Sequence, residues 1–237
     1  MRAGRKLAVQ SCIVLVGLGS MSTAAFAQTW NEIGPGFGAP AQPDAGPLTT
    51  DPNVNITSGA GALTTINGHM LNGADADLYC IRISNPSAFS ATTTGADPGH
   101  NLALALFDAA GNGVVANYDL GAADINASLT NALVTTPGVY YLMVYGEIIR
   151  YPAGAGGFIW TPPPSPATGL VGQLAPNPLA GPLTSFAFDF SRGFSSNISQ
   201  VPYSVALTGV EYHLVPAPGM LGLVGVAGVI GGTRRRR

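Results

Sequence analysis

Short runs of apolar, β-branched and aromatic residues recur along the middle of the chain, separated by turn-forming residues. In residues 77–84 the side chains alternate, so that Tyr79, Ile81 and Ile83 form one solid apolar face. Similar runs occupy residues 89–94, 101–108, 138–145, 183–190 and 202–210. The body shows no long, well-capped helical period. The pattern predicts an all-β fold, an antiparallel, jelly-roll-like β-sandwich of about eight strands.

Two segments rich in glycine and proline lie beside and inside this body. Residues 28–60 have no period, which predicts an extended leader that lies on the domain or acts as a linker. The sandwich is then expected over residues 61–213. Within it, residues 151–182 form an insertion that we expect to be a semi-rigid, polyproline-like excursion anchored by Phe158 and Trp160. An exposed Trp160 could stack on sugar, but packing against the sandwich is the favoured alternative.

The first 27 residues have the three parts of a secretory signal peptide. Basic residues near the start precede an apolar run over residues 7–18, and Ala25-Phe26-Ala27 comes directly before Gln28. This order predicts a signal helix that is cleaved after Ala27. The alternative, a lasting N-terminal anchor, is disfavoured because the apolar run is too short to span a bilayer comfortably.

The other end of the chain, residues 214–237, also has the features of a targeting segment. Val215-Pro216-Ala217-Pro218 is followed by an uncharged, glycine-rich apolar segment and then by Arg234, Arg235, Arg236 and Arg237. The uncharged stretch from Leu214 to Thr233 would span roughly 30 Å as a helix, although its prolines and glycines weaken that helix. Four arginines resist crossing a bilayer, so they are expected to stay in the cytoplasm while the body lies outside. A disordered basic tail is the alternative, but it does not explain why the charges follow an apolar run.

This three-part tail resembles the PEP-CTERM sorting signal. Val215, Pro216, Ala217 and Pro218 stand where that family often has Pro-Glu-Pro, and the arginine cluster stands at its usual terminal position. The resemblance implies a bacterial protein that is held transiently in the inner membrane by a short transmembrane helix. It also implies an exosortase as the processing partner, with a cut near residues 216–218, and the alanine at the centre of the motif leaves the cut position open.

Composition and charge narrow the partners further. Of 237 residues, 9% are charged and 46% are hydrophobic. Loss of both ends would leave three basic residues, Arg82, Arg150 and Arg192, against twelve acidic ones, a charge of about −9. Such a body repels nucleic acid, whereas cations and neutral glycans suit it. With Cys12 in the signal peptide, Cys80 is the one remaining cysteine, which is expected to be a buried small hydrophobe.

The body carries a second resemblance, to the pre-peptidase C-terminal (PPC) domain family. It rests on residues 73–79 (Gly-Ala-Asp-Ala-Asp-Leu-Tyr), on 104–108 with the following Gly-Asn-Gly, and on 137–144 (Pro-Gly-Val-Tyr-Tyr-Leu-Met-Val). Residues 203–209 are similar to that family's closing strand, so the match covers about residues 62–210. It implies a β-sandwich of the kind found beside secreted enzymes. Where the family often has paired aspartates, this chain has Asn117-Tyr118-Asp119, so the resemblance does not carry a metal site with it.

The sequence gives little support for an enzyme. The histidines, His69, His100 and His213, lie in no recognisable catalytic motif, and no Gly-x-Ser-x-Gly or His-Glu-x-x-His occurs. Calcium is the better-motivated ligand, because Asp75, Asp77 and Asp119 are oxygen donors near expected strand ends. The alternative is that each such residue caps its own turn. Apart from this calcium site, no cofactor is expected.

The sequence therefore predicts an exported bacterial protein without catalytic activity. It is expected to pass through the secretion machinery, to be anchored in the inner membrane in transit, and to end at the cell surface or in the extracellular matrix. The alternative is a secreted module that binds carbohydrate, such as extracellular polysaccharide, or calcium.

Overall fold

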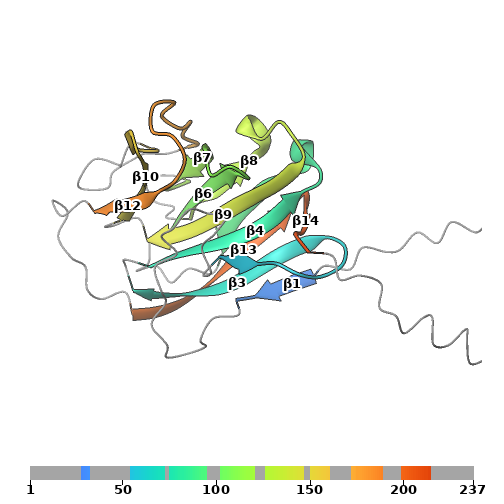
Figure 1. The fold of residues 1–237 in the computed structure, drawn as a ribbon. Helices are drawn as coiled ribbons and strands as arrows, with labels where there is room; N and C mark the ends of the chain where they lie inside the picture. The colour runs from blue at the N-terminus through green and yellow to red at the C-terminus, as the bar shows by residue number, and fades with distance from the viewer. Residues whose placement is uncertain are drawn as a thin grey trace, which may run out of the picture.

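The computed structural model describes residues 28–32, 54–72, 75–94, 102–120, 126–146, 150–160, 172–188 and 199–214. Within these ranges the chain is all-β, with short 3-10 helices at Pro86–Ala88 and Asn131–Leu133. Two large sheets pack face to face as a sandwich, and a small third sheet lies against one of them (Figure 1). The predicted all-β, sandwich-like character is confirmed.

Sheet A has five strands in the order β1-β3-β13-β5-β8. Their bounds are β1 Gln28–Asn31, β3 Leu63–Asn72, β13 Ser199–Thr208, β5 Ser90–Thr94 and β8 Ser128–Thr130. The neighbours β3, β13, β5 and β8 pair antiparallel, whereas β1 joins β3 in parallel. The segment expected as a leader thus supplies the edge strand of this sheet.

Sheet B has six strands in the order β14-β4-β9-β6-β7, with β2 beside β4. Their bounds are β14 Val210–Tyr212, β4 Ala76–Ile83, β9 Gly138–Gly146, β6 Leu102–Asp108, β7 Gly113–Asn117 and β2 Asn55–Ile56. The chain passes from sheet A to sheet B at Gly209, whose φ of 70° and close approach to the Asn85 carbonyl oxygen suit glycine alone. The motifs of the PPC resemblance lie on β4, β6, β9 and β13.

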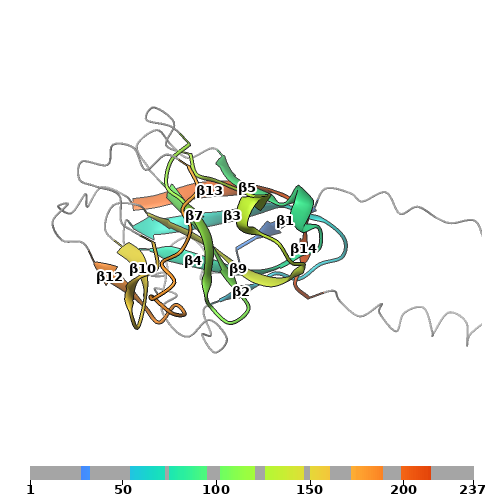
Figure 2. The same ribbon diagram turned by 90° about the horizontal axis from the view of Figure 1, so that it is seen from above.

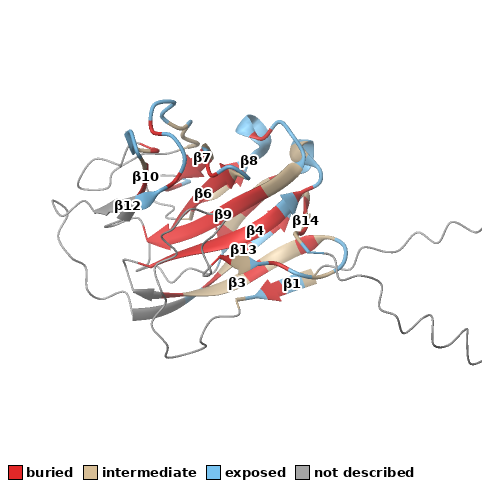
Figure 3. Cartoon of the chain, in the orientation of Figure 1, coloured by how far each residue is buried: buried red, intermediate tan, exposed pale blue. Residues whose placement is uncertain are grey.

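The main core fills the space between the two sheets because alternate side chains on each facing strand are apolar. From sheet A come residues such as Ile66, Val205 and Leu207, and from sheet B come Ile81 and Leu142. All of these are buried, as the red strands of Figure 3 show. Burying this apolar area is the main favourable contribution to folding.

A second core lies on the outer side of sheet B. There Phe107, Met143 and Tyr145 pack against Ile159 and Trp160, which come from the segment after β10. The third sheet, in the order β11-β10-β12, comprises β10 Arg150–Gly154, β11 Gly157–Phe158 and β12 Ser185–Phe188. It lies toward the end of the sandwich opposite β14 (Figures 1 and 2). The described parts of the insertion therefore form a covering layer instead of an excursion.

The structure corrects the expected strand list in several places. The two large sheets hold five and six strands, more than the predicted eight in total, and the expected runs did not include β3 or the short β1, β2, β7, β8 and β14. The run over 183–190 yields β12, which belongs to the third sheet. The signal helix and the tail helix fall on residues outside the described ranges. Among the residues that are described, no helix has the length and apolar character needed to cross a membrane.

The two ends of the described domain meet at one end of the sandwich. Gln28, which opens β1, pairs with Leu63. The adjacent Ala62 forms a bridge with Glu211 of β14, and Leu214 bridges Ser58. The start of the domain and its last described residue are therefore neighbours in space, although most of the chain separates them in sequence.

Candidate functional site

A cluster of acidic and tyrosine side chains lies at the boundary between β1, β3, β4 and β13. Asp77 faces the same side of β4 as Tyr79 and Ile81, toward the space between the sheets, and it is 3% exposed. Asp75, just before β4, is equally buried, and its Oδ1 accepts a hydrogen bond from the backbone N–H of Ala76 at 3.0 Å. A buried carboxylate is costly unless it is paired.

Tyrosine hydroxyls supply part of that pairing. The hydroxyl of Tyr203 on β13 donates to Asp77 Oδ2 at 2.6 Å and also contacts the hydroxyl of Tyr79. Gly68 of β3 makes room for both hydroxyls, because a Cβ there would overlap each of them. Burial, and then the charge of Asp77, raises the pKa of Tyr203 well above its ordinary value. This tyrosine therefore stays protonated as a hydrogen-bond donor.

Glu32, directly after β1, completes the cluster. Its Oε2 accepts a hydrogen bond from the backbone N–H of His69 at 2.9 Å, and its side chain is hydrogen-bonded to Asp77. Burial raises the pKa of Glu32, with a further increase from the charge of Asp75, while the two hydrogen bonds oppose the shift. Through these contacts the cluster ties β1 to β4 across the core.

The third residue of the expected calcium site lies elsewhere. Asp119 follows β7, and β9 and β6 lie between β7 and β4 in sheet B. At about 4.8 Å per strand, this separation is roughly 14 Å, too far for one ion to reach both places. Among the described residues, no three Asp, Glu, His or Cys side chains gather where they could hold a metal. The structure therefore brings Asp75 and Asp77 together but not Asp119.

Polar residues near two strand ends serve the local backbone. Asp108 Oδ1 accepts from the N–H groups of Ala110 and Asn112, each at 2.9 Å. The Asn117 amide donates to the carbonyls of Asp119 and Gly172, while its oxygen accepts from the N–H of Ser128. Asp108 therefore caps its own turn.

Two residues with possible chemistry are buried. Cys80 is 2% exposed, and burial raises the pKa of its thiol to about 11, so the nucleophilic thiolate is scarce at neutral pH. Trp160 is 1% exposed and meets Phe107 edge to face, with ring centroids 5.2 Å apart. Both confirm the packing alternative, and Trp160 offers no platform for a sugar ring.

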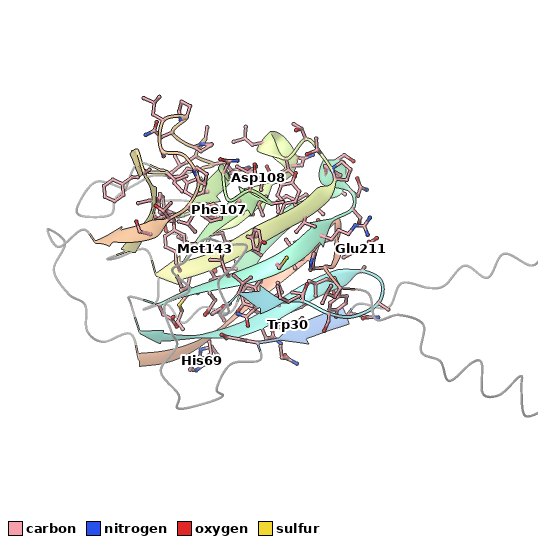
Figure 4. All side chains as sticks on the ribbon, in the orientation of Figure 1. Trp30, His69, Phe107, Asp108, Met143 and Glu211 are labelled. Atoms are coloured by element: carbon pink, nitrogen blue, oxygen red, sulfur yellow. The ribbon has the colours of Figure 1, made fainter. Side chains whose placement is uncertain are left out.

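The outer face of sheet A is an uncharged polar surface that the sequence reading missed. Its outward positions on five strands are mostly serine, threonine and asparagine: Thr29, Asn31, Thr65, Asn67, Ser90, Thr92, Thr94, Ser128, Thr130, Ser204 and Thr208. Among the described side chains, His69, Pro202 and Ala206 also lie on it, and His69 is seen on this side in Figure 4. We call it the hydroxyl face. Cross-strand hydrogen bonds order it, including Thr92 to Ser128 at 2.8 Å and Ser204 to Asn67 at 2.7 Å.

Of the residues predicted to direct sorting and cleavage, the structure describes Gln28 alone. Gln28 is half-buried at the start of β1, and its carbonyl accepts from the Thr64 hydroxyl at 3.2 Å. The motif at residues 215–218, the arginines at 234–237 and the alanines at 25 and 27 lie outside the described ranges.

Glu32 and Tyr203 were not predicted as partners of Asp77, although one feature of the sequence indicates that Asp77 needs partners. Asp77 has the same parity as Tyr79, Ile81 and Ile83, so it lies on the apolar face of its strand, where a carboxylate requires partners from the opposite sheet.

Compared with models of known protein families and with curated proteins, the chain matches none of them. Its function is therefore inferred from its own residues and their geometry.

Proposed function

We propose that this is an exported bacterial protein of the cell surface or extracellular matrix, without catalytic activity, that is sorted through its PEP-CTERM-like tail and released by an exosortase. The observation that carries the proposal is the meeting of the two ends of the domain. Gln28 and Glu211 lie beside the adjacent residues Leu63 and Ala62. A signal peptide and a membrane tail would thus both leave from one end of the sandwich. During transit the hydroxyl face is then free to meet the outside.

The chemistry of the body supports the same proposal. Its thiol is buried with a raised pKa, and the carboxylates of Glu32 and Asp77 are engaged in joining β1 to β4. The expected mature charge of about −9 keeps such a protein soluble and away from anionic partners. These features suit a building component of an envelope better than an enzyme.

The tail can be tested with two variants in a host that has an exosortase. In the first, Arg234, Arg235, Arg236 and Arg237 are all replaced by Gln, which leaves the apolar segment intact. In the second, Pro216→Ala and Pro218→Ala alter the motif alone. Fractions of membrane, surface and medium are then compared by immunoblot with those of the unchanged chain. A matched control replaces Pro176 and Pro178, in a loop of the body, by Ala.

We expect the unchanged chain and the loop control to reach the surface or medium. The motif variant should accumulate in the membrane, because recognition fails while the anchor remains. The arginine variant should lose its fixed orientation, because the charges that resist translocation are gone. Equal release of all four proteins, with or without the exosortase, would contradict the proposal.

A second candidate function, binding of neutral polysaccharide, is favoured by the hydroxyl face. Its hydroxyl and amide groups can both donate and accept hydrogen bonds, and none of its described positions carries Asp, Glu, Lys or Arg. A neutral, hydroxyl-rich polymer meets no charge to desolvate there. Trp160, the earlier candidate for sugar stacking, is buried and takes no part.

This function is tested by affinity electrophoresis in gels that contain neutral polysaccharides. Thr92→Arg puts a long charged side chain at the middle of the hydroxyl face, while Ser84→Arg adds the same charge at an exposed turn of the other sheet. Binding through the face predicts that Thr92→Arg abolishes the retardation and that Ser84→Arg does not. Equal retardation of both variants would place binding elsewhere.

A further inference from the structure

The first residue of β1 is also the residue at which the exported chain is predicted to begin. Ala25-Phe26-Ala27 predicts cleavage directly before Gln28, and β1 spans Gln28–Asn31. The strand lies at the edge of sheet A, next to β3 (Figure 1). Cleavage at this place would leave a glutamine with a free α-amino group as the first residue of an edge strand.

An N-terminal glutamine carries a nucleophile and an electrophile within one residue. The α-amino nitrogen attacks the side-chain Cδ and closes a five-membered ring. The bond from Cδ to Nε2 breaks, and ammonia leaves with the proton that the amine gives up, so no oxidant or other reactant is needed. Because an α-amino group has an ordinary pKa of about 8, part of it is unprotonated at neutral pH, and the reaction within one residue needs no encounter between molecules.

The fold has room for such a ring at this position. A pyroglutamyl ring restricts rotation about the N–Cα bond as the ring of proline does, and sheets accept proline at the first residue of a strand and on edge strands. Gln28 meets both conditions. Its carbonyl oxygen accepts a hydrogen bond from the Thr64 hydroxyl at 3.2 Å, and cyclisation leaves that carbonyl unchanged.

The surroundings of Gln28 favour a neutral group over a charged one. Gln28 is half-buried and pairs with Leu63, which is 1% exposed. Partial burial of an ammonium group is costly unless the charge is paired, whereas a lactam carries no charge. Docking of β1 and cyclisation of its first residue therefore favour each other.

The exported chain would contain no second primary amine. Lys6 is the only lysine of the sequence, and it lies in the predicted signal peptide. The other basic side chains are those of arginine and histidine, which carry guanidinium and imidazole groups. The α-amino group of Gln28 is thus the one place where amine-directed chemistry could attack the exported chain.

We propose that Gln28 cyclises to pyroglutamate once the signal peptide has been removed, so that the exported protein carries no primary amine. This modification goes beyond the sorting proposal and rests on its cleavage step after Ala27. The ring closes the start of β1 with a neutral group and removes the free amine that aminopeptidases bind. The exported protein is thereby protected at its first strand from trimming and from reactive carbonyl compounds.

Amine labelling and mass spectrometry of the exported protein test the proposal. The protein is recovered from the surface or medium of its host, unfolded, and treated with an amine-reactive ester, and its N-terminal peptide is then weighed. The control variant Gln28→Ala keeps a small first residue but cannot form the ring. An isotope-labelled synthetic peptide with the sequence of residues 28–32, added at lysis, reports cyclisation that occurs during handling.

We expect an N-terminal peptide that begins at residue 28, is lighter by one ammonia than its sequence requires, and carries no label. The Gln28→Ala protein should take up one label per chain, and the mass of the unchanged chain decides even where this variant is not exported. A chain that begins at Gln28 and takes up the label, or that is cyclised no further than the added peptide, would overturn the proposal while cleavage after Ala27 stands. A chain that begins elsewhere would overturn it together with the cleavage prediction.

Discussion

The outer faces of the two large sheets differ in polarity and in what packs against them. Sheet B is apolar on both faces, and its β6 is buried at every position from Leu102 to Phe107. A third layer, which includes Trp160 and Leu183, covers its outer side. Sheet A is apolar toward the core and polar toward the outside, where no described strand packs on the hydroxyl face. One sheet is therefore packed on both sides, while the other is packed on one side only among the described residues.

This difference explains where function can lie. Strands buried on both faces read as continuous apolar runs, and such runs require a cover. The glycine- and proline-rich insertion provides it, although its composition resembles that of a linker. Among the described residues, the hydroxyl face of sheet A is then the surface that remains for partners.

Truncation of Trp160, which anchors the third layer on sheet B, should have the largest effect on stability. Trp160→Ala leaves a cavity beside Phe107 in the second core, and truncation of a fully buried tryptophan typically costs about 3–5 kcal/mol. Urea unfolding measures the loss of stability. Thr94→Ala, at an exposed position of sheet A, is the control and should change stability by less than about 0.5 kcal/mol. Similar losses for both variants would contradict the division between the sheets.

A smaller loss of stability is expected at Gly68 of sheet A, which lies against the hydroxyls of Tyr79 and Tyr203. Gly68→Ala places a Cβ against the Tyr79 and Tyr203 hydroxyls, and such overpacking costs about 1–3 kcal/mol. Adding Tyr203→Phe removes one of the two hydroxyls, so the double variant should lose less stability than the sum of the single variants. Additive losses in urea unfolding would show that the two sites do not interact.

The attachment of β1 should depend on pH. Because the folded state raises the pKa of Glu32, it binds more protons than the unfolded state between the ordinary and the raised pKa. The stabilisation by this group is full below the ordinary pKa and is lost as pH rises through the raised one. The facing groups are Asp75 just before β4, Asp77 of β4, Tyr203 of β13 and the His69 N–H of β3.

Urea unfolding from pH 4 to pH 8 measures this dependence. Glu32→Gln should flatten part of it by removing the titrating carboxyl group. Glu211→Gln, on sheet B, serves as the matched control and should retain the slope. The same slope in the Glu32→Gln variant would show that another group is responsible.

The smallest effect is expected on the hydroxyl face itself. Thr92→Ala removes a part-buried hydrogen bond to Ser128 at the sheet surface, for which we expect a loss of about 0.5–1 kcal/mol. Thermal unfolding measures this change. A loss as large as that of Trp160→Ala would mean that the face is part of the structural core.

The strands with the clearest patterns were predictable from the sequence, and the weaker ones were not. Alternation in residues 77–84 and the apolar run in 138–145 correspond to β4 and β9 within one or two residues. By contrast, β3 contains Asn67-Gly68, which reads as a turn but here gives space to two hydroxyls from other strands. The short β1 depends on a parallel partner far along the chain, so local pattern alone did not predict it.

The candidate site shows the same limit. The sequence placed Asp75 and Asp77 near a strand end, but their partner Glu32 comes from a segment expected to be a leader, and Tyr203 comes from a strand of the other sheet. Asp119 was grouped with them because it too lies near an expected strand end, although two strands lie between. Local spacing predicts which residues are near strand ends, whereas sheet order decides which ends meet.

Intact mass of the protein recovered from the surface of its host tests the central claim most directly. Sorting at both ends predicts a chain that begins at Gln28 and ends close to residues 216–218, without the apolar tail and its arginines. A host lacking the exosortase should yield instead a membrane-bound form with the tail intact. A surface protein that retains Arg234–Arg237, or whose mass does not depend on the exosortase, would contradict the claim.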